Sequence, residues 1–286
     1  MPRLPLSLRP IMALFSSTDK DGKDMSFLDH IEVLRWHLVR SAAVVLIVAV
    51  VLFCYNNIVF DVIIFGPKQP DFISYRALCK LSHLFLHNDS MCIGQSHYEL
   101  INLELAGQFT THIWISLVGG IVLSVPYLVW ELWRFIKPAL KLKEKVAAKG
   151  FVFYASMLFL MGILFSYFVI VPLTVSFLGS YQMSTLVENR ISMDSYISLV
   201  TTLTLAMGLV FELPIVVYFL TKIGLLGPAF MKTYRKHAIV VILIVAAFIT
   251  PSPDITSQLL VAFPLFVLYE VSIIVSKRAD KKRAAV

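Results

Sequence analysis

The sequence predicts an all-α polytopic membrane protein with six transmembrane helices. Of its 286 residues 58% are hydrophobic and only 15% are charged, and the mean hydropathy is +0.80. A soluble domain is typically about 45–50% apolar and about 25% charged. Six apolar segments alternate with polar connections, as in a chain that crosses a bilayer repeatedly. We therefore expect one membrane domain over residues 26–276, between a disordered arm (1–25) and a basic tail (277–286).

The membrane domain begins with the pattern of an amphipathic helix. Over residues 26–41 apolar side chains recur every three or four positions, with Glu32 and Arg35 on the other side. This spacing predicts a helix that lies on the membrane surface and runs into the first span, at about residues 38–56. Glu32 and Arg35 are three residues apart, a spacing that suits a surface ion pair.

About fifty residues of mixed composition follow, over 56–107. They are neither apolar enough to span the bilayer nor charged enough to be disordered, so we expect a folded cap. Cys79 and Cys92 lie in it, and pairing in a disulfide and remaining free are equal alternatives. His83 and His87 are four residues apart, but such a pair alone is a weak sign of metal binding. We therefore expect no metal site.

The other five spans have individual features. Pro172 closes the third, and Glu212 and Pro214 interrupt the fourth. Between Lys236 and Pro251 only 14 residues are available for the fifth, about 21 Å of helix against an apolar core of about 30 Å. Either the bilayer thins there or neighbouring helices shelter the short span. The expected limits are about 110–135, 150–171, 196–223, 237–250 and 255–275.

The distribution of basic residues predicts the topology. Of the 25 Lys and Arg residues, 21 lie before the first span, in 134–149, in 222–236 or after Ser276. Basic connections face the cytoplasm. Both termini are therefore expected on the cytoplasmic side of an inner (cytoplasmic) membrane. The net charge of +7 is then a topology signal, and no nucleic-acid partner is expected.

Four carboxylates in or beside the spans are candidate functional groups. Glu212 lies well inside the fourth span, where a charged acid costs about 2.5–3.5 kcal/mol. It either lines a path for a polar substrate or is a protonated carboxyl bonded to a backbone carbonyl that Pro214 frees or to a neighbouring helix. Glu131 and Glu270 are expected at cytoplasmic span ends, where water reaches them. Glu144 lies among lysines, and its simplest role is an exposed ion pair.

Enzyme motifs are absent from the sequence, which contains no GxxxxGK[ST], HExxH or GxSxG. We therefore expect neither an enzyme nor a cofactor. On residues alone, the strongest alternative function is a proton-coupled small-solute transporter that uses Glu212, with Pro214 breaking the helix. A structural or assembly protein and an intramembrane enzyme are weaker alternatives.

Four stretches together resemble the TatC family, the multispanning core of the twin-arginine (Sec-independent) protein translocase. The resemblance covers about residues 26–276, and its motifs occur in the family's order. The stretches are His30-Ile-Glu-Val-Leu-Arg35, Phe135-Ile-Lys-Pro-Ala-Leu followed by Glu144, Phe211-Glu212-Leu-Pro214, and Thr250-Pro-Ser-Pro-Asp254 with Gln258.

The resemblance implies a glove-shaped bundle that binds the twin-arginine signal peptides of folded cargo at its cytoplasmic face. It also implies the single-span partners TatA and TatB, a homo-oligomer within a larger complex in membrane lipid, and transport driven by the proton-motive force. Carried over residue by residue, the signal-peptide site consists of Glu144, Phe135, Arg35 and Glu32. Glu212 matches the family's intramembrane acid. The positions linked to partners and translocation are Pro67, Asp254 and Gln258.

One departure from the family pattern affects the expected site. The family usually has H-L-x-E-L-R-x-R, but here Val33 occupies the position of a signal-contacting glutamate and His37 that of the second arginine. Glu32, one residue earlier, points about 100° away on a helix. Either Glu144 carries more of the recognition, or Glu32 substitutes.

Overall fold

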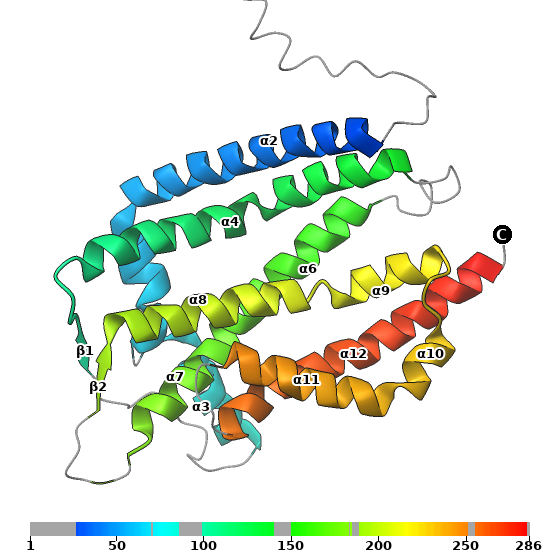
Figure 1. Cartoon of the computed structure of the whole chain (residues 1–286). Coiled ribbons are helices and arrows are strands. Elements are labelled where there is room, and N and C mark those ends of the chain that lie inside the picture. The colour runs from blue at the N-terminus through cyan, green and yellow to red at the C-terminus, as the bar shows by residue number, and fades with distance from the viewer. Residues whose placement is uncertain are drawn as a thin grey trace, which may run out of the picture.

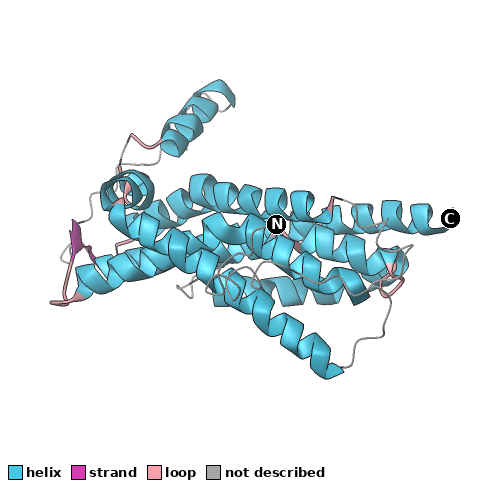
Figure 2. Cartoon of the chain, turned by 90° about the horizontal axis from the view of Figure 1, so that it is seen from above, coloured by secondary structure: helices cyan, strands magenta, loops and turns pink. Residues whose placement is uncertain are grey.

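A computed structural model describes residues 27–69, 71–85, 99–139, 150–182, 184, 189–250 and 255–284. Within these ranges the chain is an elongated helical bundle, with two short strands at one end (Figures 1 and 2). The α-helices are α2 (Phe27–Cys54), α3 (Ile73–Phe85), α4 (Gly107–Ile136), α6 (Phe151–Phe165), α7 (Val171–Ser180), α8 (Met193–Val210), α9 (Leu213–Lys222), α10 (Pro228–Thr233), α11 (Arg235–Ile249) and α12 (Ile255–Ala284). Shorter elements are the π-helical η2 (Ile58–Ile64) and η5 (Ser166–Ile170), the 3-10 helices η3 (Gly66–Lys68) and η4 (Lys137–Ala139), and the strands β1 (Glu99–Ile101) and β2 (Arg190–Ser192).

The two ends of the bundle differ in what they contain. The start of α2 and the ends of α4, α9 and α12 lie together, and we call this the termini end (Figure 1). The opposite end holds β1 and β2, which pair in parallel over three residues each, and we call it the strand end. A chain whose first and last helices start and finish at one end crosses the bundle an even number of times.

Five helical segments are long and apolar enough to cross a bilayer, which confirms the predicted class of membrane protein. They are Ile31–Cys54, Gly107–Ile136, Phe151–Ser180, Met193–Lys222 and Ser257–Lys281. The sixth expected span, α11, has 15 residues and is about 22 Å long, less than the roughly 30 Å core. The count of six spans and the cytoplasmic location of the termini therefore stay predictions. Helix α12 reaches Ala284, so most of the predicted tail is helical.

The limits of two predicted helices can be compared with the structure. Helix α2 continues without interruption from Phe27 to Cys54, and it contains no Gly or Pro at which a surface helix would turn into the bilayer. The third span does not close at Pro172 but runs to Ser180. Pro172 follows the π-helical turn η5 and stands in the first turn of α7, where its missing N–H is tolerated.

The predicted interruption of the fourth span is present. Helix α8 ends at Val210 and α9 begins at Leu213, with Glu212 between them and the buried Pro214 in the first turn of α9. A proline has no N–H to donate, so it is accommodated at a helix start. The interruption places the Glu212 side chain at a point where the helical hydrogen-bond pattern changes.

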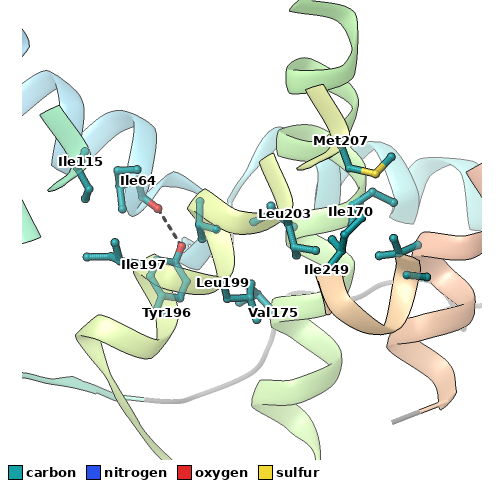
Figure 3. Packing of buried hydrophobic residues seen from close by; sticks show 14 of the residues in the cluster. Ile64, Ile115, Ile170, Val175, Tyr196, Ile197, Leu199, Leu203, Met207 and Ile249 are labelled. Carbon is teal, nitrogen blue, oxygen red and sulfur yellow. Dashed lines mark hydrogen bonds between the residues drawn. The ribbon is translucent and has the colours of Figure 1, made fainter. Parts of the chain in front are cut away.

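The main hydrophobic core surrounds α8, and its members come from elements far apart in the sequence (Figure 3). Leu203 and Met207 of α8 are fully buried, with Ile170 of η5 and Ile249 of α11 packed around them. At the strand end, Tyr196 donates a hydrogen bond to the Ile64 carbonyl at 2.9 Å, as Figure 3 shows. The segment that follows α2 is thereby attached to the core.

Candidate functional site

Helices α2 and α4 lie against each other along most of their length (Figure 1). A Cβ added to Gly120 of α4 would lie 2.9 Å from the Val45 carbonyl oxygen and 3.0 Å from the Ala49 Cβ of α2. Such distances leave no space for a side chain, so the glycine allows the two backbones to approach closely. Close packing without a hydrophobic driving force is typical of helix pairs in membranes.

A buried polar cluster joins these two helices at the termini end. Glu131 of α4 is 1% exposed, and its Oε2 lies 2.5 Å from Nδ1 of His37 on α2. The Tyr127 hydroxyl donates a hydrogen bond to Glu131 Oε1 at 2.8 Å, and Nη1 of Arg134 lies 3.6 Å from the same oxygen. Both carboxylate oxygens therefore have partners, which is the condition under which a buried acid is tolerated.

Aromatic rings flank this cluster. The Arg134 guanidinium lies over the Trp130 ring, 4.8 Å from its centroid, in a cation–π contact. The His37 and Phe135 ring centroids are 6.1 Å apart with an edge-to-face geometry. The cluster thus contacts Phe135, one of the residues that the sequence placed in the signal-peptide site.

Sequence analysis missed the role of Glu131, which it expected to be reached by water. The prediction was wrong because His37, 94 residues away in the sequence, covers the carboxylate from α2. Glu270 does match its expectation: it is partly exposed and accepts a hydrogen bond from Arg235 Nη2 at 2.7 Å. The sequence did contain one signal of a polar cluster, since Glu131 follows Tyr127 by one helical turn. That spacing does not identify the partner on α2.

The faces of α2 clarify the departure at position 33. Glu32 and Arg35 are exposed, whereas Val33 and His37 are partly buried. Val33 and His37 are four residues apart and share the face toward α4. No ion pair joins Glu32 to Arg35, and neither has a charged partner within the part of the chain that is described, so the expected surface pair is not formed.

Glu212 is not the hydrogen-bonded carboxyl that one of the two hypotheses required. Its Oε1 is buried and has no hydrogen-bond partner, although the residue as a whole is partly exposed. Its backbone carbonyl accepts hydrogen bonds from Ile215 and Val216 at 3.1 and 3.0 Å. The side chain therefore contributes no bond that holds the α8–α9 junction together.

The remaining predicted residues have structural contacts where they are described. Pro67 is fully buried, and its carbonyl accepts a hydrogen bond from the Tyr75 hydroxyl at 2.8 Å. Gln258 Nε2 donates to the Leu243 carbonyl at 2.9 Å, which joins α12 to α11. Cys79 is disulfide-bonded. The other predicted residues, Glu144, Asp254 and Cys92, lie outside the described residues, so the pairing of Cys79 with Cys92 stays a prediction.

The described ranges hold no group of three or more His, Cys, Asp or Glu side chains that could bind a metal ion. Cys54, at the end of α2, is free and exposed.

Comparison with known proteins gives concordant matches. Residues 29–264 match the family described as "Sec-independent protein translocase protein (TatC)". The protein of that name from Blattabacterium sp. subsp. Periplaneta americana is 40% identical over 264 residues, which cover 92% of this chain and 99% of that protein. Its counterpart in Aquifex aeolicus is 34% identical over 260 residues, or 91% of this chain and 98% of that one.

Solved structures match in the same way. A crystal structure of the twin-arginine translocase receptor TatC has a TM-score of 0.67 at 33% identity, covering 87% of this chain and 99% of its own. A second crystal structure of this receptor, in DDM, has a TM-score of 0.68 at 34% identity and covers 86% and 99%.

Proposed function

The chain belongs to the TatC family of Sec-independent protein translocase proteins, and from this premise we propose that it binds twin-arginine signal peptides at the termini end of α2 and α4. Members of this family are multi-pass membrane proteins of a translocase, not enzymes. The proposed site consists of Glu32, Arg35, Phe135 and Glu144. Its cargo would be folded proteins that carry such a signal.

The observation that carries this proposal is the His37–Glu131 contact with its edge-to-face neighbour Phe135. It holds the start of α2 beside the end of α4. Glu32 is five residues before His37, about 7.5 Å along the helix axis. Arg35 and Phe135 belong to sequence motifs that are far apart in the chain, and this one buried contact brings the helices that carry them together.

Glu32 has the chemistry that a pair of arginines requires. It is exposed and has no ion-pair partner within the described ranges, so its carboxylate is available. A guanidinium forms two parallel hydrogen bonds with one carboxylate, which a lysine ammonium cannot reproduce. Glu32 is accordingly our proposed substitute for the glutamate that Val33 replaces, with Glu144 as the second acceptor.

A signal peptide also has an apolar segment, and aromatic side chains lead from α4 toward α9. The Trp133 ring stacks on Phe151 of α6 at 5.1 Å between centroids and meets Phe219 of α9 edge-on at 6.4 Å. Glu212 immediately precedes α9. We place the route of the apolar segment along these helices. Cysteine crosslinks from that segment that reach α4 but never α9 would contradict this route.

The translocase partners follow from the same premise. We propose that single-span TatA and TatB subunits assemble with several copies of this chain, and that the proton-motive force drives transport without a nucleotide cofactor. The proton-coupled solute transporter considered from the sequence gains no support from the family match. It predicts solute flux into proteoliposomes, which the proposed function does not.

Photocrosslinking tests the site directly. Benzoylphenylalanine replaces Phe135 or Glu144, and the purified protein is mixed with a twin-arginine signal peptide or with a version that carries two lysines. Position Leu123, exposed on α4 nearer the middle of the bundle, is the control. We expect crosslinks at 135 and 144 that the lysine peptide loses. Equal crosslinking of both peptides, or none from a folded protein, would contradict the proposal.

A matched pair of charge variants tests Glu32. Glu32→Gln should weaken peptide binding by about tenfold to a hundredfold, because a hydrogen bond to a charged group contributes about 1.5–3 kcal/mol and 1.4 kcal/mol is tenfold. Glu99→Gln removes an exposed acid from β1 at the opposite end and should leave the affinity unchanged. The same affinity in both variants would assign the recognition to Glu144 instead.

A further inference from the structure

A cavity with both polar and apolar walls opens at the strand end, far from the proposed signal-peptide site. Its volume is about 950 Å³, within the roughly 300–1,000 Å³ typical of small-ligand sites. The walls come from the segment after α2, from β1 and from the first turns of α4. One candidate span ends at Cys54 and the next begins at Gly107, so these walls lie at the level where the helices leave the apolar layer.

The lining carries two opposite charges that are not used elsewhere. Asp61 of η2 and Lys68 of η3 both line the cavity. Neither has an ion-pair partner in the ranges that the structure describes. Amide side chains line the same cavity, including Asn57, Gln69 and Gln108. Each amide offers two donors and one acceptor, so the wall can bind both acidic and neutral oxygens.

A partly exposed histidine at the cavity wall has a buried ring nitrogen that lacks a partner. His112 Nε2 is buried without a hydrogen bond. The ring is held by stacking on Phe53, 3.9 Å between centroids, and by an edge contact to Phe60 at 5.3 Å. A buried polar atom without a hydrogen bond is unfavourable, so a ligand atom that bonds to this nitrogen would be favoured.

An apolar track leaves the same cavity along α4. Phe109 lines the cavity and is 64% exposed, and Ile113, one turn further along the same face, is 48% exposed. This direction leads from the strand end toward the middle of the bundle (Figure 1). A ligand with a zwitterionic polar part and apolar chains would match both regions at once.

We propose that this cavity binds the head group of a phospholipid that carries a phosphate and a primary ammonium, the phosphoethanolamine type. The Lys68 ammonium would pair with the phosphate, and the Asp61 carboxylate would accept hydrogen bonds from the lipid ammonium. The amides and His112 would bond to phosphate and ester oxygens, while the acyl chains follow Phe109 and Ile113. A quaternary ammonium has no N–H to donate, so phosphatidylcholine should bind less well.

Native mass spectrometry of the full chain in detergent tests this proposal. The protein is offered equal amounts of phosphatidylethanolamine, phosphatidylcholine and phosphatidylglycerol. We expect about tenfold more bound phosphatidylethanolamine than either other lipid. Asp61→Asn should remove the preference over phosphatidylcholine, and Lys68→Met should weaken binding of all three. Soluble glycerophosphoethanolamine should compete poorly, since it lacks the chains that the track receives.

Two control variants match these substitutions in chemistry but lie outside the cavity lining. Asp71→Asn removes an exposed acid that pairs with Arg76 at 3.2 Å, and Lys80→Met removes an exposed lysine of α3. Both should retain the lipid preference. Equal retention of the three lipids by the unmodified protein, or an unchanged preference in Asp61→Asn, would overturn the proposal.

Two further variants at Gln108 keep the test decisive should either charge variant fail to fold. Gln108→Trp fills the cavity from α4 and leaves both charges in place, and it should also lose the preference. Benzoylphenylalanine at position 108 should form an adduct with phosphatidylethanolamine in vesicles that contain equal amounts of the three lipids. An adduct with a polypeptide and not with lipid would show that the cavity belongs to a protein partner and would contradict the proposal.

Discussion

Nδ1 of His37 lies 2.5 Å from Oε2 of Glu131, a contact between the first and second long helices at the end where the chain begins. Glu131 is buried, and the Tyr127 hydroxyl and Arg134 occupy its other oxygen. An ionisable residue in this position within a span is costly unless it is paired. The contact thus fixes both the register of α2 on α4 and the surroundings of Phe135.

Glu131→Ala should lower the free energy of unfolding by about 1–3 kcal/mol, because His37 and Tyr127 lose a buried acceptor. Glu131→Gln should cost less, since an amide oxygen still accepts from Tyr127. Unfolding in detergent, followed by circular dichroism, measures both, and Leu132→Ala on the exposed side of α4 is the control. The Phe135 crosslink should weaken in Glu131→Ala and persist in Leu132→Ala. An unaltered Phe135 crosslink in Glu131→Ala would show that the Glu131 cluster contributes to stability but does not position the signal-peptide site.

Gly120→Ala should destabilise the packing of α2 on α4 by about 1–3 kcal/mol, because the added methyl group would contact the Val45 carbonyl and Ala49. Gly227→Ala is the matched control, since nothing lies within 4 Å of its added Cβ. The difference between their unfolding midpoints measures the effect of close packing. Equal unfolding midpoints in the two variants would contradict the prediction that close packing of α2 on α4 at Gly120 contributes to stability.

Glu212→Met should leave stability unchanged or raise it by up to about 1–2 kcal/mol, because a buried oxygen without a hydrogen bond is replaced by an apolar group of similar size. Transport of a twin-arginine cargo into vesicles should fall at the same time if the acid lies on the proposed route. The unfolding midpoint therefore reports whether Glu212 contributes to stability, and the transport rate reports whether it acts on the proposed route. A loss of stability with normal transport would contradict this prediction.

Tyr75 should make the stability of the protein sensitive to alkali. Burial raises the pKa of its phenol from 10.0 to about 12, and its side chain is 5% exposed. The unfolded chain ionises first, so this contribution to stability is complete below pH 10 and is lost as the pH rises toward 12, at about 1.4 kcal/mol for each unit. Unfolding midpoints between pH 9 and 11 should fall less steeply in Tyr75→Phe than in the unmodified protein. Parallel slopes would contradict this assignment.

Hydropathy and helix-breaking residues were sufficient to predict the features that depend only on residues close together in the sequence. The apolar segments, the break at Glu212 and Pro214 and the short α11 all occur near their predicted positions. Burial in lipid requires continuous apolar segments with satisfied backbone groups, so local composition carries this information. The π-helical turn that carries the third span past Pro172 has no such local signal.

Tertiary packing decided the properties of individual polar residues. Glu131 and Glu270 were assigned similar surroundings at the ends of spans, yet His37 buries the first and Arg235 pairs with the second near the surface. Likewise, only the contact with α4 shows that Val33 faces a helix while Glu32 stays exposed. The pairing of β1 with β2 joins residues 91 positions apart, such as Glu99 and Arg190. In each case the deciding energy comes from a partner distant in sequence, which local composition does not specify.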